Sequence, residues 1–248
     1  MATVQQLAQV PLFSKLATAD LAVAAKHLRG QVYHAGTVIV ERDQPGESMY
    51  IIVDGLVKVH TTTASGADVI LGLLRTGEFF GEMSAIDGRN RSATVTALED
   101  TRVLILESEG FKSIVAASDS FAWTMLQSLA SRVRVQNDAL ESLATRDVIG
   151  RVSDLLIRLS KRHGSKPLMR SSNAAVSTIG GKPAPEEPII IEIALTQSDI
   201  AAFVGATRER VSQTMSMLRS TGIISREPGT GHIVIEKPAR LSQIAAGH

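Results

Sequence analysis

The segment "FFGEMSAIDGRNRSATV", residues 79–95, places a carboxylate and a guanidinium on either side of a glycine-containing turn. Arg91 offers an anion a permanent charge and a fixed fork of donors, a role in which lysine is less effective. Backbone N–H groups from Gly81 to Ser84, at the start of a short helical turn, can form a concave nest of donors for the same anion. Glu82 can accept a hydrogen bond from a hydroxyl, and Ser92 can donate one to the anion. The segment therefore predicts a ligand that presents a hydroxyl and an anion at neighbouring positions.

A simpler alternative needs no ligand. Glu82 and Arg91 could pair directly inside a domain whose binding site is empty or lost, because opposite charges this close in sequence can meet across a turn. The residue types alone leave both interpretations open.

Short strands are expected around this segment. Between about residue 31 and residue 106, glycines recur every 9 to 11 residues and separate runs rich in Val, Ile, Thr and Leu. This pattern is typical of a small antiparallel sandwich or barrel with tight turns. The predicted strands are "TVIVE", "SMYIIV", "LVKVHTT", "DVILGLL", "SATVTAL" and "RVLILE".

A long helix is predicted after residue 109. Its apolar positions follow spacings of three and four, which is the seam of a two-stranded coiled coil. The predicted seam is Leu126, Leu129, Val133, Gln136, Leu140 and Leu143. Narrow stripes of this kind favour a symmetric homodimer, and the alternative is a helix that packs the stripe on its own domain.

Asp147 is predicted to cap a further helix that runs to about Arg162. Residues 163–188 are rich in Ser, Gly and Pro and lack a period, so they are expected to form a long surface loop or a partly disordered insert. "IIIEIAL" is then predicted to form a strand.

The C-terminal segment predicts a helix-turn-helix. Thr196 and Asp199 form a capping box for a first short helix, and Gly205 ends it in a conformation that glycine adopts cheaply. Thr207 then caps a second helix, while the small Ala201 allows the two helices to cross closely. Two strands around a glycine turn, "GIISREPGTGHIVIE", add a wing.

The second helix of this motif carries side chains that suit readout of the major groove. Arg can contact guanine bidentately, Glu can accept from cytosine, and Gln can pair with adenine, while further arginines contact phosphates. The expected DNA-binding residues are Thr207, Arg208, Glu209, Arg210, Ser212 and Gln213, and Arg210, Arg219 and Arg226 are expected to contact phosphates.

Composition sets limits on other functions. Residues 1–149 hold 13 Lys/Arg against 17 Asp/Glu, and residues 150–248 hold 13 against 8, so the basic excess lies in the C-terminal part. The absence of cysteine excludes disulfides and cysteine-ligated clusters, and the histidines show no paired ligand spacing, so no metal site is expected. No apolar run is long enough to span a membrane, which favours a cytoplasmic protein.

No catalytic motif stands out. No G-x-S-x-G segment occurs, and "IGGKPAP" departs from a P-loop because Val176 stands where its first glycine is needed and Pro183 follows its lysine. We therefore expect no enzyme activity.

Taken together, these modules resemble the Crp/Fnr family of bacterial transcription regulators, most sharply in "FGE" followed by "RSA", which is similar to a cyclic-nucleotide phosphate cassette. The resemblance implies an α+β protein with an N-terminal antiparallel, jelly-roll-like β-roll at 1–117, a dimerisation helix at 118–146 and a winged helix-turn-helix at 147–248.

The resemblance implies cyclic AMP as an effector that binds between the β-roll and the long helix. The implied ligand contacts are Gly81, Glu82, Met83, Ser84, Arg91, Ser92, Val59, Leu71, Arg132, Gln136 and Asn137. Where members that bind cyclic AMP usually carry Thr, this chain has Gln136, which leaves the base open between adenine and guanine. The alternative is a regulator of the same family with another effector or with constitutive DNA binding.

The resemblance also implies partners. A homodimer is expected to bind palindromic double-stranded DNA with half-sites that resemble TGTGA, altered where the family's Arg is replaced by Gln213. RNA polymerase is a further implied partner, because some members present a loop to it where this chain has the 163–188 insert. The sign of regulation and the target genes stay open.

Overall fold

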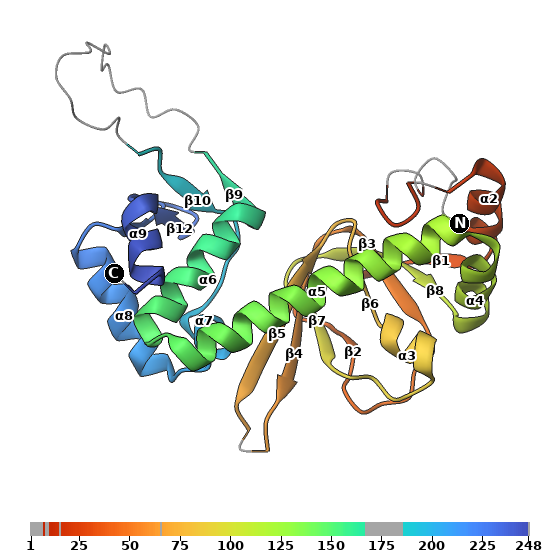
Figure 1. Ribbon diagram of the computed structural model, residues 1–248, viewed down its shortest axis with the longest axis horizontal. Helices are drawn as coiled ribbons and strands as arrows, with labels where there is room; N and C mark the ends of the chain where they lie inside the picture. Colours follow the sequence, from red (N-terminus) through yellow and green to blue (C-terminus); the bar gives the residue numbers. More distant parts are fainter. Residues whose placement is uncertain (1–6, 8–9, 15, 65, 167–185, 248) are drawn as a thin grey trace, which may run out of the picture. The chain divides into compact units, whose positions relative to one another are not determined.

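The computed structural model of the chain describes residues 7, 10–14, 16–64, 66–166 and 186–247. The chain forms two compact units, residues 1–137 and 138–248, and the boundary between them falls inside the longest helix, α5 (Asp119–Thr145). Figure 1 labels the elements of both units.

The first unit contains two four-stranded antiparallel sheets, with the orders β1-β8-β3-β6 and β2-β7-β4-β5 (Figure 1). Strand order that departs from chain order means that successive strands often change sheet, as in a jelly roll. Its strands are β1 (Leu28–Tyr33), β2 (Val38–Val40), β3 (Met49–Asp54), β4 (Leu56–Thr62), β5 (Asp68–Arg75), β6 (Phe79–Phe80), β7 (Thr94–Ala97) and β8 (Thr101–Leu106).

Alternating apolar residues hold the two sheets together. The core between them contains Ile52, Val57, Phe80 and Val95, each at most 3% exposed. Burial of each such side chain contributes about 1.5 to 3 kcal/mol. This core fixes β6, with which the segment 79–95 begins, and β3, which pairs with β6.

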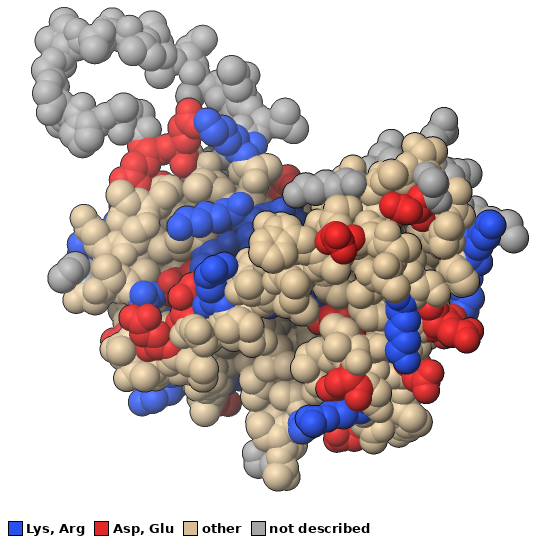
Figure 2. All heavy atoms as spheres, turned by 45° about the vertical axis from the view of Figure 1, so that its right-hand side comes forward, with Lys and Arg blue, Asp and Glu red and all other residues tan. Residues whose placement is uncertain are grey.

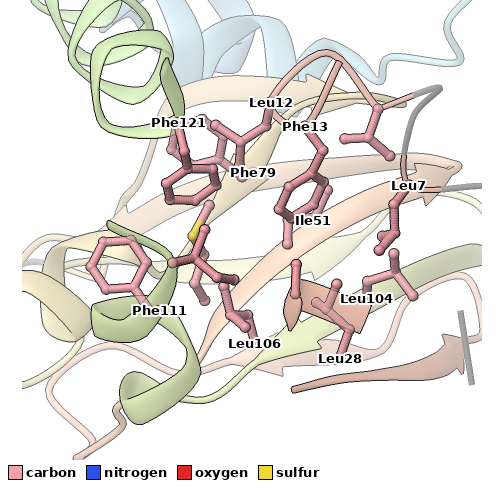
Figure 3. Packing of buried hydrophobic residues seen from close by; sticks show 14 of the residues in the cluster. Leu7, Leu12, Phe13, Leu28, Ile51, Phe79, Leu104, Leu106, Phe111 and Phe121 are labelled. Atoms are coloured by element: carbon pink, nitrogen blue, oxygen red, sulfur yellow. The ribbon is translucent and has the colours of Figure 1, made fainter. Parts of the chain in front are cut away.

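A second core lies where helices cover the first sheet. The helices of this unit are α2 (Thr18–Lys26), α3 (Glu82–Asp87), α4 (Ser108–Ala117) and α5. Figure 3 shows Phe111 of α4 and Phe121 of α5 gathered with Phe79 and Leu106. The rings of Phe111 and Phe121 lie 6.2 Å apart, edge to face. The first turns of α5 are thereby anchored to the β-roll.

The second unit is a helical domain with a small sheet, in the order β11-β12-β10-β9. Asp147 caps α6 by accepting a hydrogen bond from the Gly150 N–H at 2.8 Å. The elements are α6 (Val148–His163), β9 (Gly164–Ser165), β10 (Ile189–Ile191), α7 (Gln197–Val204), α8 (Arg208–Ser220), β11 (Ile224–Arg226), β12 (Ile233–Ile235) and α9 (Pro238–Ala245).

The predicted α+β fold is confirmed, and all six strands predicted in the β-roll are present. The strands β1, β6 and β9 and the helices α2 and α9 were not predicted. β1 has one buried residue followed by four exposed ones, so it lacks the alternation that marks a strand. Residues 164 and 165 of the predicted insert form β9, and residues 167–185 of that insert lie outside the described residues.

Within the described ranges, no helix is long and apolar enough to cross a membrane. The same part of the chain contains no group of three or more His, Asp or Glu side chains able to hold a metal ion.

Candidate functional site

The segment 79–95 contains β6, the short helix α3 with a glycine at each end, and a loop that leads to β7. Gly81 precedes α3 with φ 77°, and Gly88 follows it with φ 70°, both left-handed conformations that glycine adopts without strain. Three residues of this short helix, Glu82, Ser84 and Ala85, are buried. The turn thus carries Glu82 inward and returns the chain towards Arg91.

Arg91 is buried, with 6% of its surface exposed, although its charge is permanent. Its Nη1 donates to the carbonyl oxygens of Ser48 at 2.8 Å and Gly81 at 2.9 Å. The ring of Tyr50, which stacks on Phe80, lies 5.7 Å from the guanidinium carbon. Burial lowers the pKa of Arg91 from its usual value, while Tyr50 and two carboxylates nearby raise it. A buried cation held by dipoles is a site suited to an anion.

Two glycines make room for this guanidinium. A Cβ on Gly46 would lie 2.4 Å from Arg91 Nε and 2.6 Å from Nη2, and a Cβ on Gly81 would lie 2.7 Å from Nη1. All three distances are shorter than any ordinary contact, so a side chain at either position would displace the arginine.

Glu82 pairs with the long helix. Its Oε1 accepts a hydrogen bond from Nη1 of Arg132 in α5 at 3.0 Å, and the carboxylate is 6% exposed against 27% for the arginine side chain. Arg132 also donates to the carbonyl oxygen of Phe79 and lies over its ring, 4.5 Å from the centroid. Arg132 therefore lies next to Glu82, and its role at a ligand site stays a prediction.

The alternative of a direct ion pair between Glu82 and Arg91 is wrong in this structure. Arg91 is satisfied by two carbonyl oxygens, and the ion pair of Glu82 is with Arg132. The Glu82 carboxylate and the Arg91 guanidinium are thus held by different partners. The partner of Glu82, Arg132, is fifty residues away in the sequence.

The other residues predicted around the ligand differ in exposure. Met83 is 51% exposed, and the Ser92 hydroxyl lies 3.5 Å from its sulfur. Val59 packs against the core between the sheets. Leu71 is 48% exposed because it is the extra residue of a β-bulge between β4 and β5, which turns its side chain out of the core.

Gln136 and Asn137 are exposed on α5, one turn beyond Arg132. Leu129, by contrast, is partly buried against the core around Phe121. Leu129 of the predicted seam therefore packs partly against the chain's own domain, and the seam itself stays a prediction. The exposed face with spacings of three and four contains Trp123, Leu126, Ala130, Val133, Asn137 and Leu140.

The helix-turn-helix has the predicted geometry. The capping box between Thr196 and Asp199 is present, and Gly205 is left-handed with φ 60°. A Cβ on Gly205 would lie 3.2 Å from Leu143, so close packing adds to the conformational reason for glycine. Thr207 caps α8, whose buried side includes Val211, Met215 and Leu218.

The predicted DNA-binding side chains lie on the opposite side of α8. Arg208, Glu209, Arg210 and Gln213 are exposed and Ser212 is partly buried. Hydrogen bonds from its own backbone N–H and from Thr207 lower the pKa of Glu209, so it is an ionised acceptor at pH 7. Figure 2 shows acidic and basic side chains interspersed over one face of the molecule. The side chains exposed on α8 are therefore better evidence for DNA binding than the balance of charges.

Sequence reasoning missed Ser48, Gly46 and Tyr50 at the arginine. Ser48 contributes a carbonyl oxygen, which leaves no signal in residue type. Gly46 was recognised only as one of the regularly spaced turn glycines, and Tyr50 only as part of a strand. All three lie in β3 or just before it, and their positions at Arg91 depend on how β3 pairs with its neighbours. The sequence does not specify that register.

Comparisons with known proteins match a segment in each half of the chain to a family model. Residues 31–118 match the family model of the cyclic nucleotide-binding domain, and residues 150–244 match the Crp-like helix-turn-helix domain. The Cyclic AMP receptor protein of Thermus thermophilus is 29% identical over 96% of this chain and 97% of its own length. The CRP-like cAMP-activated global transcriptional regulator of Mycobacterium tuberculosis is 27% identical over 96% and 98%.

Among solved structures, FixK2 from Bradyrhizobium japonicum has a TM-score of 0.69 at 22% identity, covering 87% of this chain and 96% of its own. This likeness supports the fold. With a cyclic nucleotide-binding domain followed by a Crp-like helix-turn-helix, and with relatives that match along nearly their whole length, the chain belongs to the Crp/Fnr family of transcription regulators.

Proposed function

We propose that the protein is a homodimeric, sequence-specific DNA-binding regulator that is switched by cyclic AMP. The observation that carries the proposal is that Arg91 and Glu82 do not pair with each other. Arg91 is held by two carbonyl oxygens, and Glu82 is held by Arg132. A cyclic nucleotide presents its phosphate and its ribose 2′-hydroxyl at neighbouring positions. Arg91, with Ser92 and the N–H groups of residues 81–84, would bind the phosphate, and Glu82 would accept the hydroxyl.

The contact between Glu82 and Arg132 suggests how the ligand acts on α5. A ribose hydroxyl at Glu82 would share the carboxylate with Arg132, so the occupied and empty sites would hold the helix differently. Val59 and Leu71 would line the purine, and Gln136 and Asn137 would meet its far edge. A ligand can shift the switch only by its differential affinity for the two states, and a useful switch needs about 2 to 5 kcal/mol.

The proposed dimer pairs the exposed face of α5 with the same face of a second copy. The recognition helices α8 would then lie about 34 Å apart, one turn of B-DNA, on a palindromic site. The proposed boundaries remain 1–117, 118–146 and 147–248, with RNA polymerase as a further partner and the cytoplasm as the location. The names of the two relatives support cyclic AMP as the effector.

Calorimetric titration with cyclic AMP and with cyclic GMP tests the effector. We expect saturable heat from cyclic AMP, with the ratio of the two affinities reporting the effect of Gln136. Neither heat nor a thermal shift from either nucleotide at millimolar concentration would reject the cyclic nucleotide.

A second candidate is a regulator with another effector or with none, and the exposed Gln136 favours it, since this residue departs from the family pattern at the purine edge. Titration of labelled palindromic DNA with and without cyclic AMP separates the two. Equal DNA affinity under both conditions would support constitutive binding.

A further inference from the structure

Ser48, whose carbonyl oxygen accepts a hydrogen bond from Arg91, makes a second polar contact through its hydroxyl. The Ser48 hydroxyl donates to Glu107 Oε2 at 2.6 Å, while its carbonyl oxygen accepts from Arg91 at 2.8 Å. The other carboxylate oxygen of Glu107 lies 3.5 Å from the guanidinium of Arg29 on β1. A continuous line of polar contacts therefore runs from the edge of the sheet to Arg91.

Strand register produces this arrangement. Met49 of β3 lies opposite Leu106 of β8, so Ser48 and Glu107 are the next residues along the same antiparallel pair. Directly opposed side chains in such a pair are close enough to bond. Ser48 and Glu107 lie one residue beyond the ends of β3 and β8, so the last opposed pair, Met49 and Leu106, sets the distance between them.

Glu107 has no evident role in the helix that it precedes. It is the N-cap residue of α4, a position where a side chain usually accepts a hydrogen bond from the helix, yet its side chain makes no such bond. Its carboxylate is directed to Ser48 instead. Among the charged groups that raise the pKa of Arg91, Glu107 contributes more than Glu82.

We propose that Glu107 and Ser48 are positioning residues that fix the Ser48 carbonyl and thereby hold the Arg91 guanidinium in place for an anionic ligand. Nη1 makes both side-chain hydrogen bonds given above for Arg91, and Nε and Nη2 lie beside the bare backbone of Gly46. With Nη1 anchored, the guanidinium offers this edge in one orientation. Arg29 contributes little, because its contact with Glu107 is long, at 3.5 Å, and lies between two exposed side chains, whereas the Ser48 hydroxyl is 2.6 Å from the same carboxylate. The proposal rests on the proposed anion site.

Two neutral variants isolate the hydrogen bond from the charge. Glu107→Gln keeps an acceptor for the Ser48 hydroxyl, whereas Glu107→Ala removes it, and both lose the negative charge. By calorimetry with cyclic AMP we expect E107Q to bind as tightly as the wild type or more tightly, and E107A to bind about fivefold more weakly than E107Q. Ser48→Ala should lose a similar factor, and the double variant S48A/E107A should lose no more than either alone.

Glu109→Ala provides the matched control, since Glu109 is an exposed carboxylate in the first turn of the same helix. Equal affinities of E107A and E107Q, or additive losses in the double variant, would overturn the positioning role while leaving the proposed function intact. If the wild type binds no cyclic nucleotide, the proposed function fails first. The arginine side-chain NMR signal of Arg91, assigned with Arg91→Lys, then decides: faster guanidinium rotation in E107A than in E107Q supports positioning, and identical rotation overturns it.

Discussion

At the scale of single residues, the binding site depends on absent side chains as much as on present ones. Gly46 and Gly81 leave the space in which Arg91 lies, and both come from turns that precede or follow β-strands of the same sheet. The arginine is thereby buried without a carboxylate partner of its own. Its free energy of desolvation is offset by carbonyl dipoles and by an aromatic ring, which a ligand phosphate can supplement.

Substitution Gly46→Ala tests this directly. The new Cβ would lie 2.4 Å from Arg91 Nε, so the arginine must move, and we expect a loss of about 1 to 3 kcal/mol in the free energy of unfolding together with weaker cyclic AMP binding. Gly30→Ala is the control, because a Cβ there would meet nothing within 4 Å. Urea denaturation and calorimetry measure the two effects. Indistinguishable behaviour of the two variants would contradict the packing argument.

On α8, individual side chains are expected to contribute differently to DNA binding. Arg208→Ala should cost about 1 to 3 kcal/mol on the preferred site and relax the sequence preference, because a base contact is lost. Arg210→Gln should weaken binding to all sequences and reduce the slope of log affinity against log salt by about 1. Fluorescence anisotropy on matched and mutated palindromes at several salt concentrations distinguishes them. A uniform loss in Arg208→Ala would reassign that residue to the phosphates.

At the scale of elements, one side of α5 is occupied by the chain's own β-roll. Phe121, Met125 and Leu129 pack against the β-roll, and Arg132 reaches Glu82. The remaining exposed face begins at Trp123 and contains Asn137, which is a polar residue at a coiled-coil seam position. A single asparagine at such a position favours one register and two strands at a cost in stability.

Cysteine cross-linking measures this face, because the chain has no cysteine of its own. We expect Asn137→Cys to form an intermolecular disulfide on oxidation and Gln136→Cys to form little, since only residues facing the partner bring their Cα atoms within about 7 Å. Trp123→Cys and Leu140→Cys should each link to themselves only if the helices are parallel and in register. Efficient cross-linking through Gln136→Cys would restore the seam first predicted from the sequence.

Features that depend on neighbouring residues could be predicted from the sequence, and contacts between distant segments could not. The capping box at Thr196, the left-handed Gly205 and the cap at Asp147 depend on residues within a few positions of one another, so they were predicted correctly. The partner of Glu82 lies fifty residues away, and the partners of Arg91 include backbone atoms. Neither leaves a local pattern. The seam of α5 stays a prediction, because apolar residues lie on more than one side of the helix and spacing alone does not say which side its own domain covers.

At the scale of the whole molecule, the boundary between the compact units falls at residues 137 and 138, within a continuous helix. The residues proposed to meet the purine therefore lie at the end of the first unit. Any change that a ligand makes in the order of α5 at this point would be passed to the second unit through the helix backbone, which ends at Thr145, before Asp147 caps α6.

Such coupling is reciprocal. If cyclic AMP raises the affinity for palindromic DNA by a given factor, bound DNA must raise the affinity for cyclic AMP by the same factor, which we expect to lie between about 5 and 150. Calorimetry of cyclic AMP binding with and without a saturating DNA duplex measures it. Unequal factors would show that the two experiments involve different assembly states, and a factor of one would leave two independent binding modules.

Trp123 gives the molecule an optical probe of its own. It is the only tryptophan in the chain, it is 62% exposed, and it stands at the start of the free face of α5. Indole emission shifts to shorter wavelength when water is removed from the ring. Dilution of the unlabelled protein should therefore move its fluorescence spectrum to the red as second copies dissociate, and the midpoint would give the dimer dissociation constant without any chemical modification.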